Sequence, residues 1–159
     1  MKRAVILLLV FVLLLCSGCS VWDDSADVSL IQVHSNQVSV APYESLLWAQ
    51  SWTGEGWLAV DAVSLSRQFS QVYQEFPSVT YGDDFEFRCR EGVSVQYLSV
   101  YDANLDTVHS NASLDALKTL SPGTYYLVIN VKVQGYYIPA AENYEYTGYE
   151  CAYQLIVPK

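Results

Sequence analysis

The chain reads Tyr125-Tyr126-Leu127-Val128-Ile129-Asn130-Val131-Lys132-Val133 in the stretch that decides its fold class. Every second position carries a large apolar side chain, which gives a stripe made of Tyr125, Leu127, Ile129, Val131 and Val133. Successive side chains of a strand point to opposite faces of a sheet, so a period of two predicts a β-strand with one buried face. This stretch therefore predicts a long strand in a β-rich domain.

The rest of the chain also predicts mostly strands. Two hairpins are expected early in the domain, because strand-like runs flank turn sequences at 28–34 with 37–41 and at 45–52 with 57–63. Pro42 leaves an alternative to the second hairpin, since proline favours the first turn of a helix, which would begin at Tyr43. Further strands are predicted at 85–89, 95–101, 107–110 and 149–157.

One segment has helical spacing instead. Its apolar residues are Leu65, Phe69, Val72, Tyr73 and Phe76, and Pro77 follows them, so a short helix is expected at 66–75. A single helical turn is expected at 113–120, with Ser113 as its cap. Many short strands with one short helix favour an immunoglobulin-like β-sandwich, formed as one domain by residues 28–159.

The first 19 residues have the pattern of an export signal. Lys2 and Arg3 precede an apolar run at 4–15, which is shorter than the roughly 20 residues that a membrane-spanning helix needs. Ser17-Gly18-Cys19 then resembles the lipobox of bacterial lipoproteins, in which the cysteine thiol is lipidated and the chain is cut just before it. The resemblance implies a signal peptide at 1–18 and a lipidated tether at 19–27. A cleaved signal without lipid and an uncleaved anchor are the alternatives.

The charge of the processed chain limits its partners. Removing 18 residues from 159 leaves 141, and the loss of Lys2 and Arg3 leaves six basic residues against 17 acidic ones, a formal charge of −11. Nucleic-acid binding is disfavoured, because phosphate contacts need clustered Lys and Arg. Acidic lipid headgroups would also repel such a domain, so its attachment to the extracytoplasmic face of the cell membrane depends on the lipid anchor.

Two cysteines remain once the signal peptide and Cys19 are accounted for. Exported proteins reside where disulfides persist, so Cys89 and Cys151 are candidates for a disulfide. Cysteine is also among the most frequently buried residue types, so two buried free thiols are the alternative.

Several stretches between residues 42 and 155 resemble the extracytoplasmic C-terminal region of Gram-positive antirepressor metallopeptidases of the β-lactam-sensor type. The chain contains neither the His-Glu-x-x-His of their zinc helix nor a Ser-x-x-Lys of their penicillin-sensing domains, so the resemblance implies a shared accessory domain only. The stretches are Pro42-Tyr43-Glu44 with Trp48 and Trp52, Gly56-Trp57-Leu58, Tyr81 to Phe85, Gly123 to Tyr126, and Tyr144 to Cys151.

No chemical motif in the chain is complete. Asp102, Asn104 and Asp106 have the spacing that opens a calcium loop, but its later ligands are missing, so a strand-connecting turn is expected. Asp83, Asp84 and Glu86 are expected at a solvated strand end. His34 and His109 lack ligand partners at short spacing. The sequence therefore predicts no catalytic residue, metal or cofactor.

Aromatic residues are unusually abundant, with 13 Tyr, 5 Phe and 4 Trp. Most are expected in the core and in cross-strand pairs, where aromatic rings are favoured. The candidates for exposed ligand-binding rings flank a polar loop, and they are Tyr136, Tyr137, Tyr144 and Tyr146.

These observations predict a membrane-anchored lipoprotein that acts as a non-catalytic binding or accessory module, with a protein or a glycan as ligand. A partner of a membrane sensor or of an envelope-stress system is the first alternative. A hydrolase or metal-dependent enzyme is the second, and it would require the fold to unite His34 or His109 with carboxylates.

Overall fold

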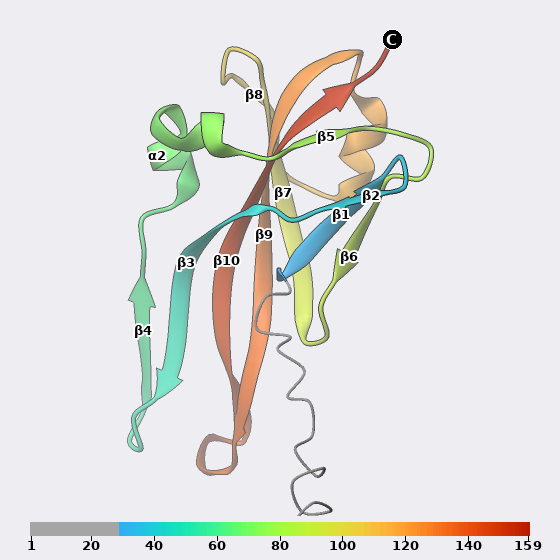
Figure 1. The fold of residues 1–159 in the computed structure, drawn as a ribbon. Coiled ribbons are helices and arrows are strands. Elements are labelled where there is room, and N and C mark those ends of the chain that lie inside the picture. Colours follow the sequence, from blue (N-terminus) through green and yellow to red (C-terminus); the bar gives the residue numbers. More distant parts are fainter. Residues whose placement is uncertain (1–28) are drawn as a thin grey trace, which may run out of the picture.

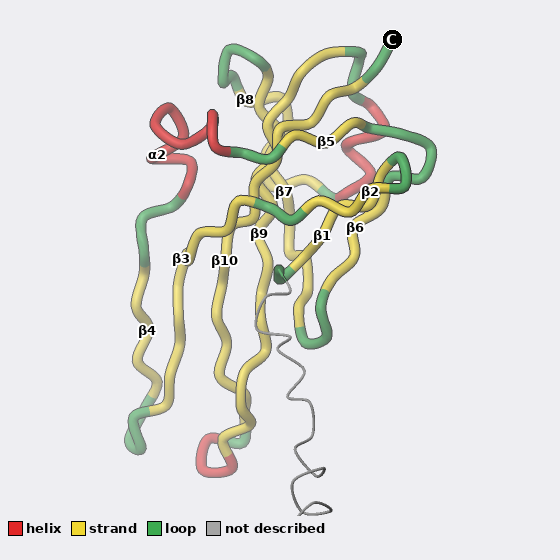
Figure 2. The backbone as a smooth tube through the Cα atoms, in the orientation of Figure 1, coloured by secondary structure: helices red, strands yellow, loops and turns green. Residues whose placement is uncertain are grey.

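Ten strands account for most of residues 29–159, the part of the chain that the computed structural model describes (Figure 2). The protein is therefore mainly β, as its alternating apolar pattern predicts. The predicted signal peptide at 1–18, the lipidated Cys19 and the tether at 19–27 lie outside the described residues.

The larger sheet is built around the two longest strands. β9 (Gly123–Ile138) contains the stretch at 125–133, and it pairs antiparallel with β10 (Asn143–Val157) along nearly its whole length. The order across the sheet is β4 (Trp57–Asp61), β3 (Tyr43–Trp52), β10, β9, β7 (Val93–Asp102) and β8 (Thr107–Ala112). β5 (Ser78–Thr80) adds a parallel pair to β10. Because β3 begins at Tyr43, the alternative helix at that position is wrong.

The smaller sheet has the order β2 (Val38–Val40), β1 (Ile31–Ser35) and β6 (Glu86–Cys89). Its inward residues meet the apolar stripe of β9, so that Ile31, Val33, Leu127 and Ile129 are completely buried in one core cluster. Burial of the stripe confirms the period of two that the sequence indicates. The main core therefore lies between the two sheets (Figure 1).

The turn between β1 and β2 lies at Asn36–Gln37, one residue later than the predicted turn at 35–36. Both residues have positive φ, 51° and 63°, as a two-residue turn of type I′ requires. Asp84 supports this turn from a distant loop, because its carboxylate accepts the backbone N–H groups of Asn36 at 2.8 Å and Gln37 at 3.1 Å. These hydrogen bonds lower the pKa of Asp84.

The expected helix at 66–75 is present as α2 (Leu65–Val72), which continues into a short 3₁₀ segment (Tyr73–Glu75). It packs on the face of the large sheet opposite to the main core, and forms a second cluster that includes Leu65, Phe69, Phe76, Tyr126, Val128 and Ala152. The predicted turn at 113–120 is a 3₁₀ helix (Leu114–Thr119), and another 3₁₀ turn (Pro139–Ala141) joins β9 to β10.

Helix α2 covers only one end of its sheet face. In Figure 1 the lower parts of β3, β4, β9 and β10 extend well beyond α2 and the smaller sheet. The strand residues below α2 on that face are half-buried or exposed at most positions, among them Trp48, Gln50, Tyr146 and Gln134. Among residues 29–159, no other element covers the area of the large sheet beside the helix.

Glu150 on β10 predicts a specific pH dependence of stability. Its buried carboxylate accepts the backbone N–H of Leu65 at the start of α2. Burial raises the pKa of Glu150 above its usual 4.5, and the hydrogen bond from Leu65 opposes this only in part. A raised folded pKa means that the folded state holds this proton more tightly. The contribution of Glu150 to stability is therefore greatest at low pH and is lost as pH rises from about 4.5 through the folded pKa.

We expect Glu150→Gln to remove this pH-dependent contribution to stability, because glutamine keeps an oxygen acceptor and carries no charge. The measurement is urea unfolding at a series of pH values, plotted as the difference between wild type and variant. Glu55→Gln, in the exposed turn between β3 and β4, is the matched control. It should leave the slope of the unfolding free energy against pH unchanged. An equal slope in wild type and Glu150→Gln would contradict the assignment.

Candidate ligand-binding face

The uncovered area is a mixed aromatic and polar surface, here named the open face. Strand register places Asp61, Trp48, Gly148, Lys132 and Ser94 in one row across five strands. Alternate residues along the same strands share that face. The open face consists of Trp48, Gln50, Trp52, Trp57, Ala59, Asp61, Ser94, Lys132, Gln134, Tyr137, Tyr144 and Tyr146.

Trp48 is held in place by a glycine on the neighbouring strand. A Cβ atom added to Gly148 would collide with the indole ring of Trp48 and would lie only 2.7 Å from its Cδ1 atom. The indole therefore fills the space above the β10 backbone, as glycine in a strand permits where another group approaches closely. Trp48 is half-buried, so part of its ring remains accessible to solvent.

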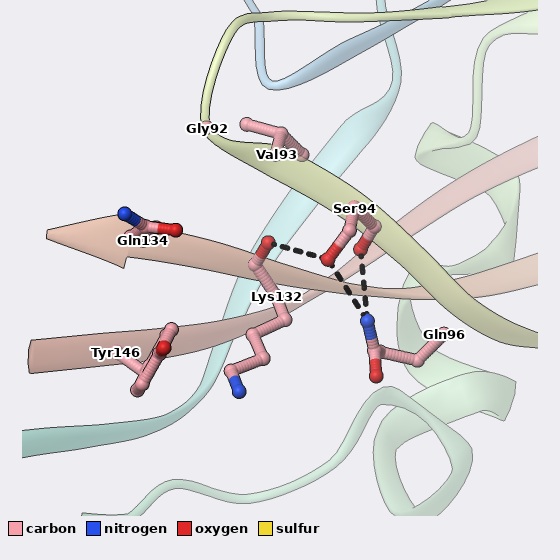
Figure 3. Close-up of a pocket in the computed structure, with 7 residues that line it drawn as sticks. All are labelled: Gly92, Val93, Ser94, Gln96, Lys132, Gln134 and Tyr146. Carbon is pink, nitrogen blue, oxygen red and sulfur yellow. Dashed lines mark hydrogen bonds between the residues drawn. The ribbon is translucent and has the colours of Figure 1, made fainter. Parts of the chain in front are cut away.

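Tyr146 is the second fixed ring of the open face. The ammonium nitrogen of Lys132 lies 3.5 Å from the centre of the Tyr146 ring, which is a cation–π contact. Both residues line a shallow depression of about 400 Å³ together with Gly92, Val93, Ser94, Gln96 and Gln134. Figure 3 shows Lys132, Tyr146 and Gln96 extending to the same side of the strands. Gln96 Nε2 donates to Ser94 Oγ at 2.9 Å, which fixes one rim of the depression.

A second depression lies on the other side of Trp48. Its volume is about 410 Å³, and it is lined by Leu47, Trp48, Asp61, Ala62, Ser64 and Arg67, next to the start of α2. The two depressions flank the Trp48–Tyr146 region from opposite sides. This arrangement is suited to an elongated ligand that crosses several strands.

The four predicted binding tyrosines separate into two groups. Tyr137 and Tyr144 are 5.0 Å apart between ring centres, and Tyr144 and Tyr146 are 6.5 Å apart, so these three rings gather on the open face. Tyr136 falls in an irregularity of the β9–β10 pairing, between Gly135 and Tyr137, and adjacent strand residues point to opposite faces of a sheet. Its side chain is 81% exposed and makes no contribution to the open face.

Residues from other strands complete the open face, and the sequence alone did not single them out as ligand-binding candidates. Trp48, Gln50 and Lys132 come from β3 and β9, and they join Tyr146 through strand register. Gly148 was the available signal, because an isolated glycine in a strand pattern indicates a close approach by another group. The identity of that group depends on a register that the sequence does not encode locally.

The structure places Cys89 and Cys151 as free cysteines on opposing sheets, Cys89 exposed on β6 and Cys151 buried on β10. Burial raises the pKa of the Cys89 thiol. Burial likewise raises the pKa of the Cys151 thiol, and the nearby Glu44 and Cys89 add to this effect. The predicted disulfide is therefore absent from this arrangement, and its formation in the exported protein stays a prediction.

The free-thiol arrangement predicts selective alkylation. Iodoacetamide should modify Cys89 in the folded protein and should reach Cys151 only after unfolding, because Cys151 is completely buried. Peptide mass spectrometry measures both modifications. If the predicted bridge forms instead, neither cysteine is alkylated after denaturation, and the intact mass is lower by two hydrogens until a reductant is added.

The other polar candidates have structural partners. Asp102 Oδ1 accepts the N–H groups of Asn104 at 2.8 Å and Asp106 at 3.0 Å, so this segment is the predicted turn between β7 and β8. His34 contacts Ser39, and its Nε2 lies 3.9 Å from Oδ2 of Asp84, whose carboxylate already accepts the two backbone N–H groups of the β1–β2 turn. His109 contacts Thr119 and lies in the other sheet. Glu86 of the acidic group pairs with Arg88. Within residues 29–159, no group of three or more His, Cys, Asp or Glu side chains is placed to hold a metal ion.

Comparison with protein-family models, with curated proteins and with solved structures gave no match. In the described part of the chain, no helix has the length and apolar character needed to cross a bilayer.

Proposed function

We propose that this protein is an extracytoplasmic lipoprotein that is anchored through Cys19 and acts as a non-catalytic binding module. The open face is its ligand-binding surface. The observation that carries the proposal is the Trp48 ring held over Gly148, beside the Lys132–Tyr146 pair, on a sheet area that α2 leaves uncovered. Aromatic rings held in fixed positions contribute large contact areas at low entropic cost, which favours binding.

The composition supports a lipid anchor as the means of attachment. The processed chain carries a formal charge of −11, which repels acidic headgroups, so the domain itself has little affinity for the membrane surface. Two or more acyl chains on one residue give stable attachment, whereas one chain gives a marginal one. Attachment and ligand binding are thus assigned to different parts of the chain.

We further propose that the two facing sheets are a divergent immunoglobulin-like sandwich. Antiparallel pairing and a shared apolar core support this assignment. The parallel pairing of β5 with β10 is a departure from that pattern. An experimental structure whose strands superpose on an immunoglobulin domain in the same connectivity would establish it, and a different connectivity would exclude it.

Partnership with a membrane sensor or an envelope-stress system is the second candidate, and the edge strand β4 favours it. Leu58 and Val60 on β4 are 55% and 58% exposed, and no strand within the described residues 29–159 pairs with the outer edge of β4. An extended segment of a sensor protein could add to such an edge by strand pairing. A charge on β4, as in Val60→Lys, would abolish that pairing and leave the open face intact.

Site-specific cross-linking in cells tests the main proposal. A photo-reactive amino acid at Gln134, exposed on the open face, should form adducts with envelope material. The same amino acid at Thr107, exposed on β8, is the matched control and should form none. Adducts at Thr107 alone, or at neither position, would contradict a binding role for the open face.

A further inference from the structure

The open face alternates aromatic rings with polar side chains that both donate and accept hydrogen bonds. Trp48 supplies a ring in the row that runs from Asp61 to Ser94. Tyr146 supplies a ring in the next row, where Gln50 and Gln134 place amides on either side of it. Each amide offers two N–H donors and a carbonyl acceptor, and each hydroxyl can donate and accept. A ligand that matches this pattern has apolar patches the size of a ring and many groups that donate and accept hydrogen bonds.

We propose that the open face binds a neutral glycan chain that carries acetamido groups, an assignment that rests on the binding role proposed above. The C–H face of a pyranose ring stacks on Trp48, since the apolar side of a sugar packs well against an aromatic ring. Hydroxyl and acetamido groups pair with the side chains of Gln50, Gln134 and Ser94. The two depressions on either side of Trp48 and Tyr146 accommodate the residues that follow along the chain.

Charge separates this ligand from polyanions. Lys132 is the one cation in the row that runs from Asp61 to Ser94, and its ammonium is engaged over Tyr146. In the second depression the charge of Arg67 is accompanied by the carboxylate of Asp61. With the formal charge of −11 on the processed chain, phosphate-rich polymers and single-stranded nucleic acids would be repelled. The face is therefore suited to an uncharged polymer.

The distribution of polar groups separates the glycan from a proline-rich peptide, which is the closest rival. Grooves for proline-rich peptides are lined by aromatic rings, and the ligand offers mainly backbone carbonyls as acceptors. Here Gln50, Gln134, Ser94 and Gln96 surround the rings and supply acceptors as well as donors. The acceptors would remain unpaired against polyproline, and they find hydroxyl and amide donors on a sugar.

Two substitutions probe Trp48 in different ways. Trp48→Ala removes the ring. Gly148→Ala keeps every side chain of the open face but adds a methyl group where the indole lies, so the ring must move. Gln50→Ala combined with Gln134→Ala removes hydrogen-bonding groups at surface positions and is not expected to disturb the core. Tyr136→Ala is the matched control, because this exposed tyrosine lies off the open face.

The experiment is calorimetric titration of the full-length lipidated protein, in a detergent without sugar headgroups, with a hexamer of β-1,4-linked N-acetylglucosamine. We expect Trp48→Ala, Gly148→Ala and the double glutamine variant each to weaken binding about tenfold or more, as truncation of a central contact residue does. Tyr136→Ala should bind as the wild type does. The unfolding midpoint of each variant is measured alongside, and the glutamine variant decides the outcome if a Trp48 or Gly148 variant fails to fold.

Each remaining result overturns a defined part of the inference. If the hexamer does not bind, or binds independently of Trp48, while cross-links still form at Gln134 in cells, the glycan assignment is wrong and the binding face stands. Binding of a polyproline peptide that Trp48→Ala abolishes, with no sugar binding, has the same meaning. If neither sugar binding nor cross-links are observed, the glycan assignment and the proposed function both fail.

Discussion

Cys19→Ala should release the protein from the membrane completely. The substitution removes the only thiol that the lipobox pattern offers to the lipid, and the acidic domain has no other means of attachment that its composition suggests. Export itself should continue, because the basic residues and the apolar run of the signal are intact. We therefore expect the variant in the extracytoplasmic soluble fraction, after its signal has been cleaved by another peptidase.

Membrane sedimentation and labelling with palmitate measure this effect. Cys16→Ala is the matched control, because Cys16 would be discarded with the signal peptide and its loss should leave sedimentation and labelling unchanged. If Cys19→Ala still sediments with membranes and the wild type incorporates no palmitate, Cys19 is not the anchor. The chain would then be held by an uncleaved signal or by a protein partner.

Leu127→Ala should destabilise the domain more than any exposed substitution. Leu127 is completely buried on β9, and its cross-strand neighbours Val100 and Tyr153 are completely buried as well. Truncation of a buried leucine costs about 2–5 kcal/mol, because the lost transfer free energy is joined by the cost of a cavity. A typical domain has about 5–15 kcal/mol of stability in total, so this one change consumes a large share of it.

Urea unfolding, followed by circular dichroism, measures the loss. Leu58→Ala is the matched control, because Leu58 is 55% exposed on β4 and its truncation should change stability by less than about 0.5 kcal/mol. Similar values for the two variants would mean that the stripe of β9 does not form the centre of the core.

The local elements of this fold follow from the sequence to different degrees. The stripe at 125–133 and the helix at 65–75 are predictable, because each depends on a periodicity contained within one segment. The first turn is displaced by one residue from its prediction. Its two positive φ angles are supported by Asp84, which is 47 residues beyond Gln37 in the chain, and a local pattern cannot contain that contact.

The candidate site is predictable only where it is local. Tyr137, Tyr144 and Tyr146 flank one loop, so their clustering follows from the hairpin that contains them. Trp48 reaches Gly148 through the pairing of β3 with β10, and a register shift beside Gly148 sets which residues face each other. A one-residue change in register moves a side chain to the other face of a sheet, so the open face depends on information that is distributed over several strands.

The position of β10 has a consequence for the order of folding. Within residues 29–159, β10 comes after all the other strands in sequence and lies between β3 and β9, and Ala152 pairs with Tyr43, a separation of 109 residues. The large sheet cannot close before the C-terminal segment is available, and non-local pairing of this kind slows folding. For a chain that is exported as proposed, late closure is an advantage: the polypeptide remains extended during translocation and folds once its last strand has crossed the membrane.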